Sequence, residues 1–162
     1  MQAQRNNIVF LDIDGVLNSV KYDRERTATQ GNIDESRMPL LQALFAACPA
    51  QIVLSSSWRK HWGPTPYECD GIGEELNRLF AKYGLKIFDK TPVLSTHGRA
   101  QEIGAWLDAH AAEVDRFVIL DDEFGGWGEL SEHLVRTNPR IGRGLEERHV
   151  QEAISLLRVP ET

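Results

Sequence analysis

The chain has little cysteine and no long hydrophobic run. Its only cysteines among 162 residues are Cys48 and Cys69, too few for the disulfide framework that stabilises small secreted proteins. No run approaches the roughly 18 apolar residues of a membrane-spanning helix, and the polar stretch 1–7 does not fit a signal peptide. We therefore expect a cytoplasmic protein that resides in a reducing compartment and does not associate with a membrane.

Positive charge is also scarce. The chain has 18 lysines and arginines against 24 aspartates and glutamates, so its formal net charge is −6 at pH 7. This balance argues against non-specific binding to nucleic acids or acidic membranes, although one local basic pocket would be enough for a nucleic-acid end. The composition is otherwise ordinary for a globular protein, and the length predicts a single domain over residues 1–162.

Short apolar strands alternate with amphipathic helices along the chain. Strands are predicted at 8–11, 51–54, 85–88, 117–120 and 134–136, and helices at 36–48, 74–83, 99–110 and 145–157. The polar stretch 18–35 is expected to be a loop. Such alternation is typical of an α/β fold. We predict a Rossmann-like three-layer αβα sandwich with a mostly parallel central sheet.

Polar side chains follow three of these strands at the point where each strand ends. They are Asp12 and Asp14 after the first strand, 55–57 after the second, and Asp121 and Asp122 after the fourth. Parallel strands bring their carboxyl ends to one edge of a sheet, where open α/β sheets bind ligands. We expect these side chains to meet at one crevice.

The first pair of acids points to a metal-dependent phosphate site. Two ionised carboxylates at the end of a buried strand are costly unless a cation or hydrogen bonds compensate them. Gly15 follows and leaves the backbone open, as a Mg²⁺-dependent phosphate site requires. The alternative is an ordinary strand end, where Asp and Gly are turn formers.

These residues resemble the four motifs of the haloacid dehalogenase (HAD) superfamily of Asp-based phosphotransferases. The first motif, Asp-x-Asp-Gly-(Val/Thr), matches 12–16, and the second, a strand ending in Ser or Thr, matches 52–55. The third is a Lys or Arg near the start of a later helix, here Arg99, and the fourth is an apolar strand ending in paired acids, here 118–122. The amino-acid sequence of 11–18 and 55–59 looks closest to that of HAD domains associated with RNA-repair proteins.

The resemblance implies a role for each acid. Asp12 would attack phosphorus and form an aspartyl-phosphate, and Asp14 would act as general acid and then as general base. Mg²⁺ would be held by the Asp12 carboxylate, the Asp14 backbone carbonyl and Asp122, with Asp121 in a supporting position. In a regular strand Asp12 and Asp14 would share one face, so distinct roles require the chain to turn between them.

The resemblance also implies phosphate contacts. Ser55 would hydrogen-bond the transferring phosphate, although Ser56 and Ser57 compete for this role and one of them is expected to cap a short helix. Arg99 would neutralise charge on the phosphoryl oxygens in the transition state. Lys90 is the competing candidate for the same cation.

Aromatic and basic residues gather directly after the second motif, at Trp58, Arg59, His61 and Trp62. Their planes could stack on a nucleobase, as in single-strand recognition, although one of the two tryptophans is expected to be buried. Trp127 is a further candidate for lining the crevice.

The interval 18–49 is too short for a large cap once its helix is allotted, so we predict a minimal cap or none. An open site would admit a polynucleotide or nucleotide end, our first substrate class, or a small metabolite phosphate, our second. A phosphotransferase remains an alternative, because its first half-reaction is the same. A further alternative is a non-catalytic module that binds phosphate or a partner.

Overall fold

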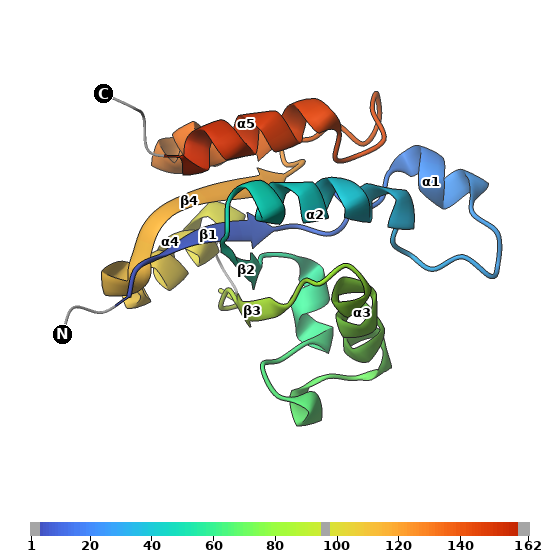
Figure 1. Cartoon of the computed structure of the whole chain (residues 1–162), viewed down its shortest axis with the longest axis horizontal. Helices are drawn as coiled ribbons and strands as arrows, with labels where there is room; N and C mark the ends of the chain where they lie inside the picture. The colour runs from blue at the N-terminus through green and yellow to red at the C-terminus, as the bar shows by residue number, and fades with distance from the viewer. Residues whose placement is uncertain (1–3, 95–97, 159–162) are drawn as a thin grey trace.

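A computed structural model describes residues 4–94 and 98–158, and its centre is a five-stranded sheet (Figure 1). All strand pairs are parallel, in the order β3-β2-β1-β4-β5. The strands are β1 (Asn6–Leu11), β2 (Gln51–Leu54), β3 (Ile87–Lys90), β4 (Val114–Asp121) and β5 (Leu134–Arg136). The predicted α/β class with a parallel sheet is confirmed.

Both faces of the sheet are buried, which explains the uninterrupted apolar runs 8–11, 52–54 and 117–120 in its central strands. In β1, Val9 and Leu11 belong to one hydrophobic cluster, whereas Ile8 and Phe10 belong to another. The first cluster is covered by α2 (Met38–Ala47) and α5 (Glu147–Leu157), which lie side by side. Buried residues of α3 (Gly71–Lys82) also belong to this cluster. The second cluster is covered by α4 (Arg99–Ala109). The predicted three layers are therefore present.

The prediction of a loop over 18–35 was wrong in one part. A six-residue helix, α1 (Val20–Glu25), begins after Ser19, whose side chain accepts a hydrogen bond from the backbone N–H of Tyr22. None of the residues of α1 is buried. The helix therefore has no apolar stripe from which periodicity could reveal it.

Element boundaries differ from the predictions by a few residues. Helix α3 begins at Gly71 rather than at residue 74, because Asp70 caps it by accepting hydrogen bonds from two backbone N–H groups. Gly84, with a φ of 72°, follows its end as expected. Strand β3 begins two residues later than predicted and β4 three residues earlier, while β2 and β5 agree.

The connection between β1 and α2 contains only α1 and a short 3₁₀ helix at Glu35–Arg37. This connection therefore forms no large cap over the carboxyl edge of the sheet, in agreement with the prediction. Of the stretch 1–7, residues 1–3 lie outside the described part. Within the described ranges no helix is both long and apolar enough to cross a membrane.

Candidate active site

Three of the four predicted motifs meet at the carboxyl edge of the central strands. The backbone N–H of Ser55 donates to the carbonyl of Leu11 at 2.9 Å, and the N–H of Asp12 donates to the carbonyl of Leu120 at 3.0 Å. These two bonds continue the pairing of β2, β1 and β4 by one residue. Ser55, Asp12 and Asp121 therefore stand next to one another in a row across the sheet.

The chain turns directly after Asp12, as the distinct roles of the two aspartates require. Strand β1 ends at Leu11, and a carboxylate oxygen of Asp12 accepts the backbone N–H of Ile13 at 2.9 Å. The N–H groups of Val16 and Leu17 both donate to the carbonyl of Ile13, which closes the turn. As a result Asp12 is buried, whereas Asp14 is exposed.

Gly15 has a structural reason to be glycine. Its φ is 88°, a region that L side chains rarely adopt, and a Cβ at this position would collide with the carboxylate of Asp122. Its backbone is held on both sides, since its N–H donates to Asn18 Oδ1 at 2.8 Å and its carbonyl accepts from Thr137 Oγ1 at 2.8 Å. The turn thus leaves room for the second acid of the fourth motif.

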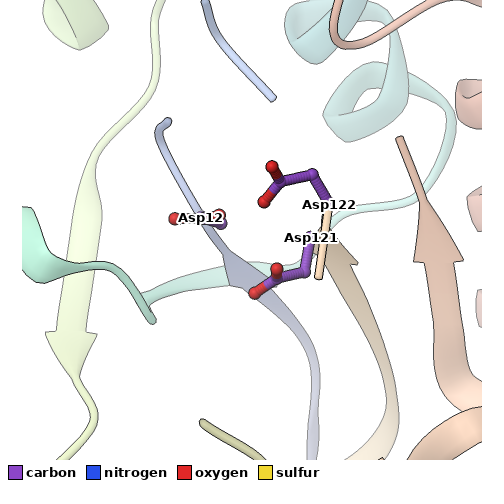
Figure 2. Close-up of side chains that lie close together, drawn as sticks. All are labelled: Asp12, Asp121 and Asp122. Carbon is purple, nitrogen blue, oxygen red and sulfur yellow. The ribbon is translucent and has the colours of Figure 1, made fainter. Parts of the chain in front are cut away.

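The carboxylates of Asp12, Asp121 and Asp122 form a cluster (Figure 2). One oxygen from each lies within 4.8 Å of the others. Burial and the negative charge of Asp121 raise the pKa of Asp12 to about 8. Burial also raises the pKa of Asp121, against the opposing effect of Arg99. Three carboxylate oxygen donors this close together match the preference of a hard divalent cation such as Mg²⁺.

Arg99 reaches this cluster from the first turn of α4. Its Nη1 lies 3.0 Å from Asp12 Oδ2 and 2.7 Å from Asp121 Oδ2. Lys90, the competing cation, has a different environment: its Nζ donates to the backbone carbonyls of Arg59 at 3.0 Å and Trp62 at 2.6 Å. The structure therefore brings Arg99 to the acids and engages Lys90 with the backbone that follows β2.

The three serines after β2 differ in their surroundings. Ser55 is fully buried, and its Oγ has no hydrogen-bond partner among the described residues. Ser56 caps the 3₁₀ helix Ser57–His61 by accepting the backbone N–H of Trp58. Ser57 is exposed. One serine is thus a helix cap, as predicted, and Ser55 stands on the strand end next to Asp12.

The aromatic and basic cluster after β2 is divided between the site and the interior. The indole Nε1 of Trp58 donates to Asp14 Oδ2 at 3.2 Å, and this side chain is half-buried. Arg59 is buried against Glu102, with 2.6 Å between Nη2 and Oε2. Trp62 is the tryptophan that is buried, as expected of one of the two. Trp127 also packs in the interior, against the second hydrophobic cluster.

Sequence reasoning did not single out Asn18, Thr137 or Glu102. Asn18 bonds the N–H of Gly15 and donates to Asp14 Oδ1 at 2.9 Å, so it fixes the turn and the second aspartate. Thr137 follows β5, and this position after a strand was the only available signal for it. Glu102 lies one turn after Arg99 on α4, which hinted at a shared surface but not at its partner.

Comparison with known proteins gives one family. A family model described as the HAD domain in Swiss Army Knife RNA repair proteins matches residues 8–150. The match spans all four motifs and confirms the resemblance seen in the sequence. No curated protein and no solved structure matches the chain.

Proposed function

Since the chain belongs to the family of HAD domains in Swiss Army Knife RNA repair proteins, we propose that it is a Mg²⁺-dependent phosphomonoester hydrolase acting on nucleotide or polynucleotide ends. The observation that carries the proposal is an acidic cluster beside a buried hydroxyl. Asp12 belongs to the cluster, and Ser55 Oγ lies on the neighbouring strand end with no hydrogen-bond partner in the described part of the chain. A phosphoryl group placed there would offer phosphorus to Asp12 and an oxygen acceptor to Ser55.

The proposed reaction has two displacements at phosphorus. Asp12 attacks the phosphorus and forms an aspartyl-phosphate, while the ester oxygen leaves with a proton from Asp14. Asp14 then takes a proton from water, and the resulting hydroxide attacks the phosphorus and releases inorganic phosphate from Asp12. Ser55 and Arg99 hold the phosphoryl oxygens as charge develops on them.

The residues present fit a magnesium ion. The carboxylates of Asp12 and Asp122 and the backbone carbonyl of Asp14 would hold it, with Asp121 in support. When bound, Mg²⁺ would supply positive charge that offsets the repulsion between the Asp12 carboxylate and an anionic substrate. The absence of a Cβ at Gly15, which leaves Asp122 in place, supports this assignment.

Two observations support nucleic-acid or nucleotide ends as the substrate class. The family comprises HAD domains of RNA repair proteins, and the connection between β1 and α2 forms no large cap over the site. Asp14 is exposed at the edge of the sheet, so a bulky leaving group can approach it. An open edge suits a polymer end better than it suits a metabolite that has to be enclosed.

The test is phosphate release with and without Mg²⁺ by wild type, Asp12→Asn and the exposed control Asp23→Asn. Substrates are 3′- and 5′-phosphorylated oligonucleotides, mononucleotides and sugar phosphates. We expect Mg²⁺-dependent release in wild type and Asp23→Asn only, with nucleotide ends preferred. Preference for sugar phosphates would indicate a metabolite phosphatase, and transfer to an alcohol acceptor a phosphotransferase. No turnover on any substrate would overturn the proposed hydrolase and favour a binding module.

A further inference from the structure

Two cavities adjoin each other next to Asp14. One, of about 280 Å³, is lined by Asp14 and Lys60 among others. The other, of about 290 Å³, extends along α3 and is lined by Leu79 and Arg78 among others. Asn32, Trp58 and Ile72 line both cavities. We call these two neighbouring cavities, whose lining extends from Asp14 past Trp58 to Arg78, the Trp58 groove.

Trp58 is held in a fixed position within the groove. Its Nε1 donates to Asp14 Oδ2 at 3.2 Å, and part of its ring packs against the hydrophobic core. Asp14 is the proposed acid for the leaving oxygen, so the group bonded to that oxygen begins beside the indole. A half-buried indole that lines the groove beside Asp14 offers a stacking surface to a flat ring.

The charges around the groove leave two cations available. Neither Lys60 nor Arg78 forms a salt bridge with any residue in the described ranges. Lys82, the third cation that lines the groove, is paired with Glu35. Glu75 is the other acidic residue that lines the cavity along α3. The lining of the groove therefore includes two cations, Lys60 and Arg78, that no salt bridge within the described ranges neutralises.

We propose that the Trp58 groove binds the terminal nucleoside of a phosphorylated single-stranded nucleic acid. The base stacks on the Trp58 indole, and the backbone phosphates that follow lie against Lys60 and Arg78. Single-strand binding sites combine these two elements, an aromatic platform and cations that track the backbone. The inference rests on the proposed function, because the position of the leaving oxygen at Asp14 sets where the nucleoside begins.

A small metabolite phosphate fits these observations less well. It would fill the cavity at Asp14 and leave the second cavity, with its apolar side chains Ile72 and Leu79, without a ligand. Stacking of one base contributes about 5- to 150-fold in affinity. A base-dependent gain of that size is the signature that separates a nucleoside site from a plain phosphate site.

Binding without turnover tests the proposal directly. Asp12→Asn protein is titrated, by fluorescence anisotropy, with a labelled single strand that carries a terminal phosphate and with the same strand lacking its terminal base. We expect the base-containing strand to bind at least 5-fold more tightly. Adding Trp58→Ala removes this preference, whereas adding Tyr67→Ala, which deletes a 99% exposed aromatic outside the groove, keeps it.

Three further variants guard against misfolding of Trp58→Ala and test the cations. Ile72→Trp adds bulk at a side chain that is 40% exposed, fills the groove without opening the core, and should also remove the base preference. Lys60→Gln and Arg78→Gln should each reduce the slope of log K against log salt concentration by about 0.7. The exposed control Lys21→Gln should leave that slope unchanged.

The outcomes separate this inference from the proposed function. Equal binding of the two strands, or a preference that survives both Trp58→Ala and Ile72→Trp, overturns the nucleoside site even if the enzyme hydrolyses phosphate esters. A base preference that depends on Trp58, in a wild-type protein that releases no phosphate from any substrate, supports the nucleoside site and overturns the hydrolase.

Discussion

The Arg59 guanidinium lies 2.6 Å from the Glu102 carboxylate, and both side chains are buried. Glu102 Oε2 also accepts the backbone N–H of Leu94 at 2.9 Å. Glu102 lies on α4 one turn after Arg99, and Arg59 lies four residues after Ser55. The ion pair thereby links the segment that positions the proposed phosphate-binding hydroxyl to the helix that carries the proposed cation.

Removal of Glu102 should destabilise the protein strongly. Glu102→Ala leaves the Arg59 guanidinium buried without its partner, and breaking a buried pair in this way costs about 3–5 kcal/mol. The free energy of unfolding, measured by urea denaturation, should fall by this amount. Glu35→Ala is the matched control, because it removes an acid from the exposed pair with Lys82 and should change the midpoint little. Similar losses in the two variants would contradict the structural role of the buried pair.

Substitution of Gly15 should abolish the response to Mg²⁺. In Gly15→Ala the added Cβ meets the Asp122 carboxylate, so this proposed ligand has to move. The control is Gly84→Ala, which has a similar positive φ of 72° but open space around it, and shares only the backbone strain. We expect both variants to melt at a lower temperature and only Gly84→Ala to be stabilised by Mg²⁺ as wild type is. An equal Mg²⁺-dependent shift in Gly15→Ala would remove Asp122 from the metal site.

The two candidate cations should respond differently to mutation. Arg99→Ala removes the group between Asp12 and Asp121, and we expect kcat to fall by about 10²- to 10³-fold. Arg99→Lys should recover part of this loss. Lys90→Ala should lower the free energy of unfolding instead, because its ammonium bonds two backbone carbonyls. If Lys90→Ala lowers kcat more than Arg99→Ala does, the assignment of the two cations is reversed.

Stability without metal should depend on pH through Asp12. Its pKa is raised from 3.8 to about 8 by burial and by Asp121, so between these values the folded state binds more protons than the unfolded state. The contribution of Asp12 to stability is therefore most favourable below about pH 4 and decreases as the pH rises to about 8. In EDTA, Asp12→Asn should melt higher than wild type at pH 8, with the gap narrowing toward pH 5. A lower melting temperature for the variant at pH 8 would contradict the raised pKa.

The sheet and the clustering of the acids were predictable because their signals are local. An uninterrupted apolar run ending in Asp12 indicates a strand buried on both faces, and the carboxyl edge is then fixed by topology. The same logic gave Asp121 and Asp122. Helix α1 was missed because its residues are not buried, so only the cap at Ser19 marks it.

The support around the site was not predictable, because it depends on contacts between distant residues. Arg59 was a candidate for stacking on a base, yet its partner Glu102 lies 43 residues away and holds it in the interior. Thr137 bonds the carbonyl of Gly15 across 122 residues. Nothing in the spacing around either residue identifies such a partner, whereas the fold brings each pair together.

The central claim is that the Asp12 carboxylate is the nucleophile, and acid quenching during turnover tests it most directly. Wild type and Asp12→Asn are mixed with Mg²⁺ and a phosphorylated oligonucleotide, quenched with acid, digested and mapped by mass spectrometry. We predict a phosphoryl group on the wild-type peptide that contains Asp12, and neither this group nor phosphate release in the variant. Phosphate release by Asp12→Asn at the wild-type rate, with phosphate on another residue or on none, would contradict the account.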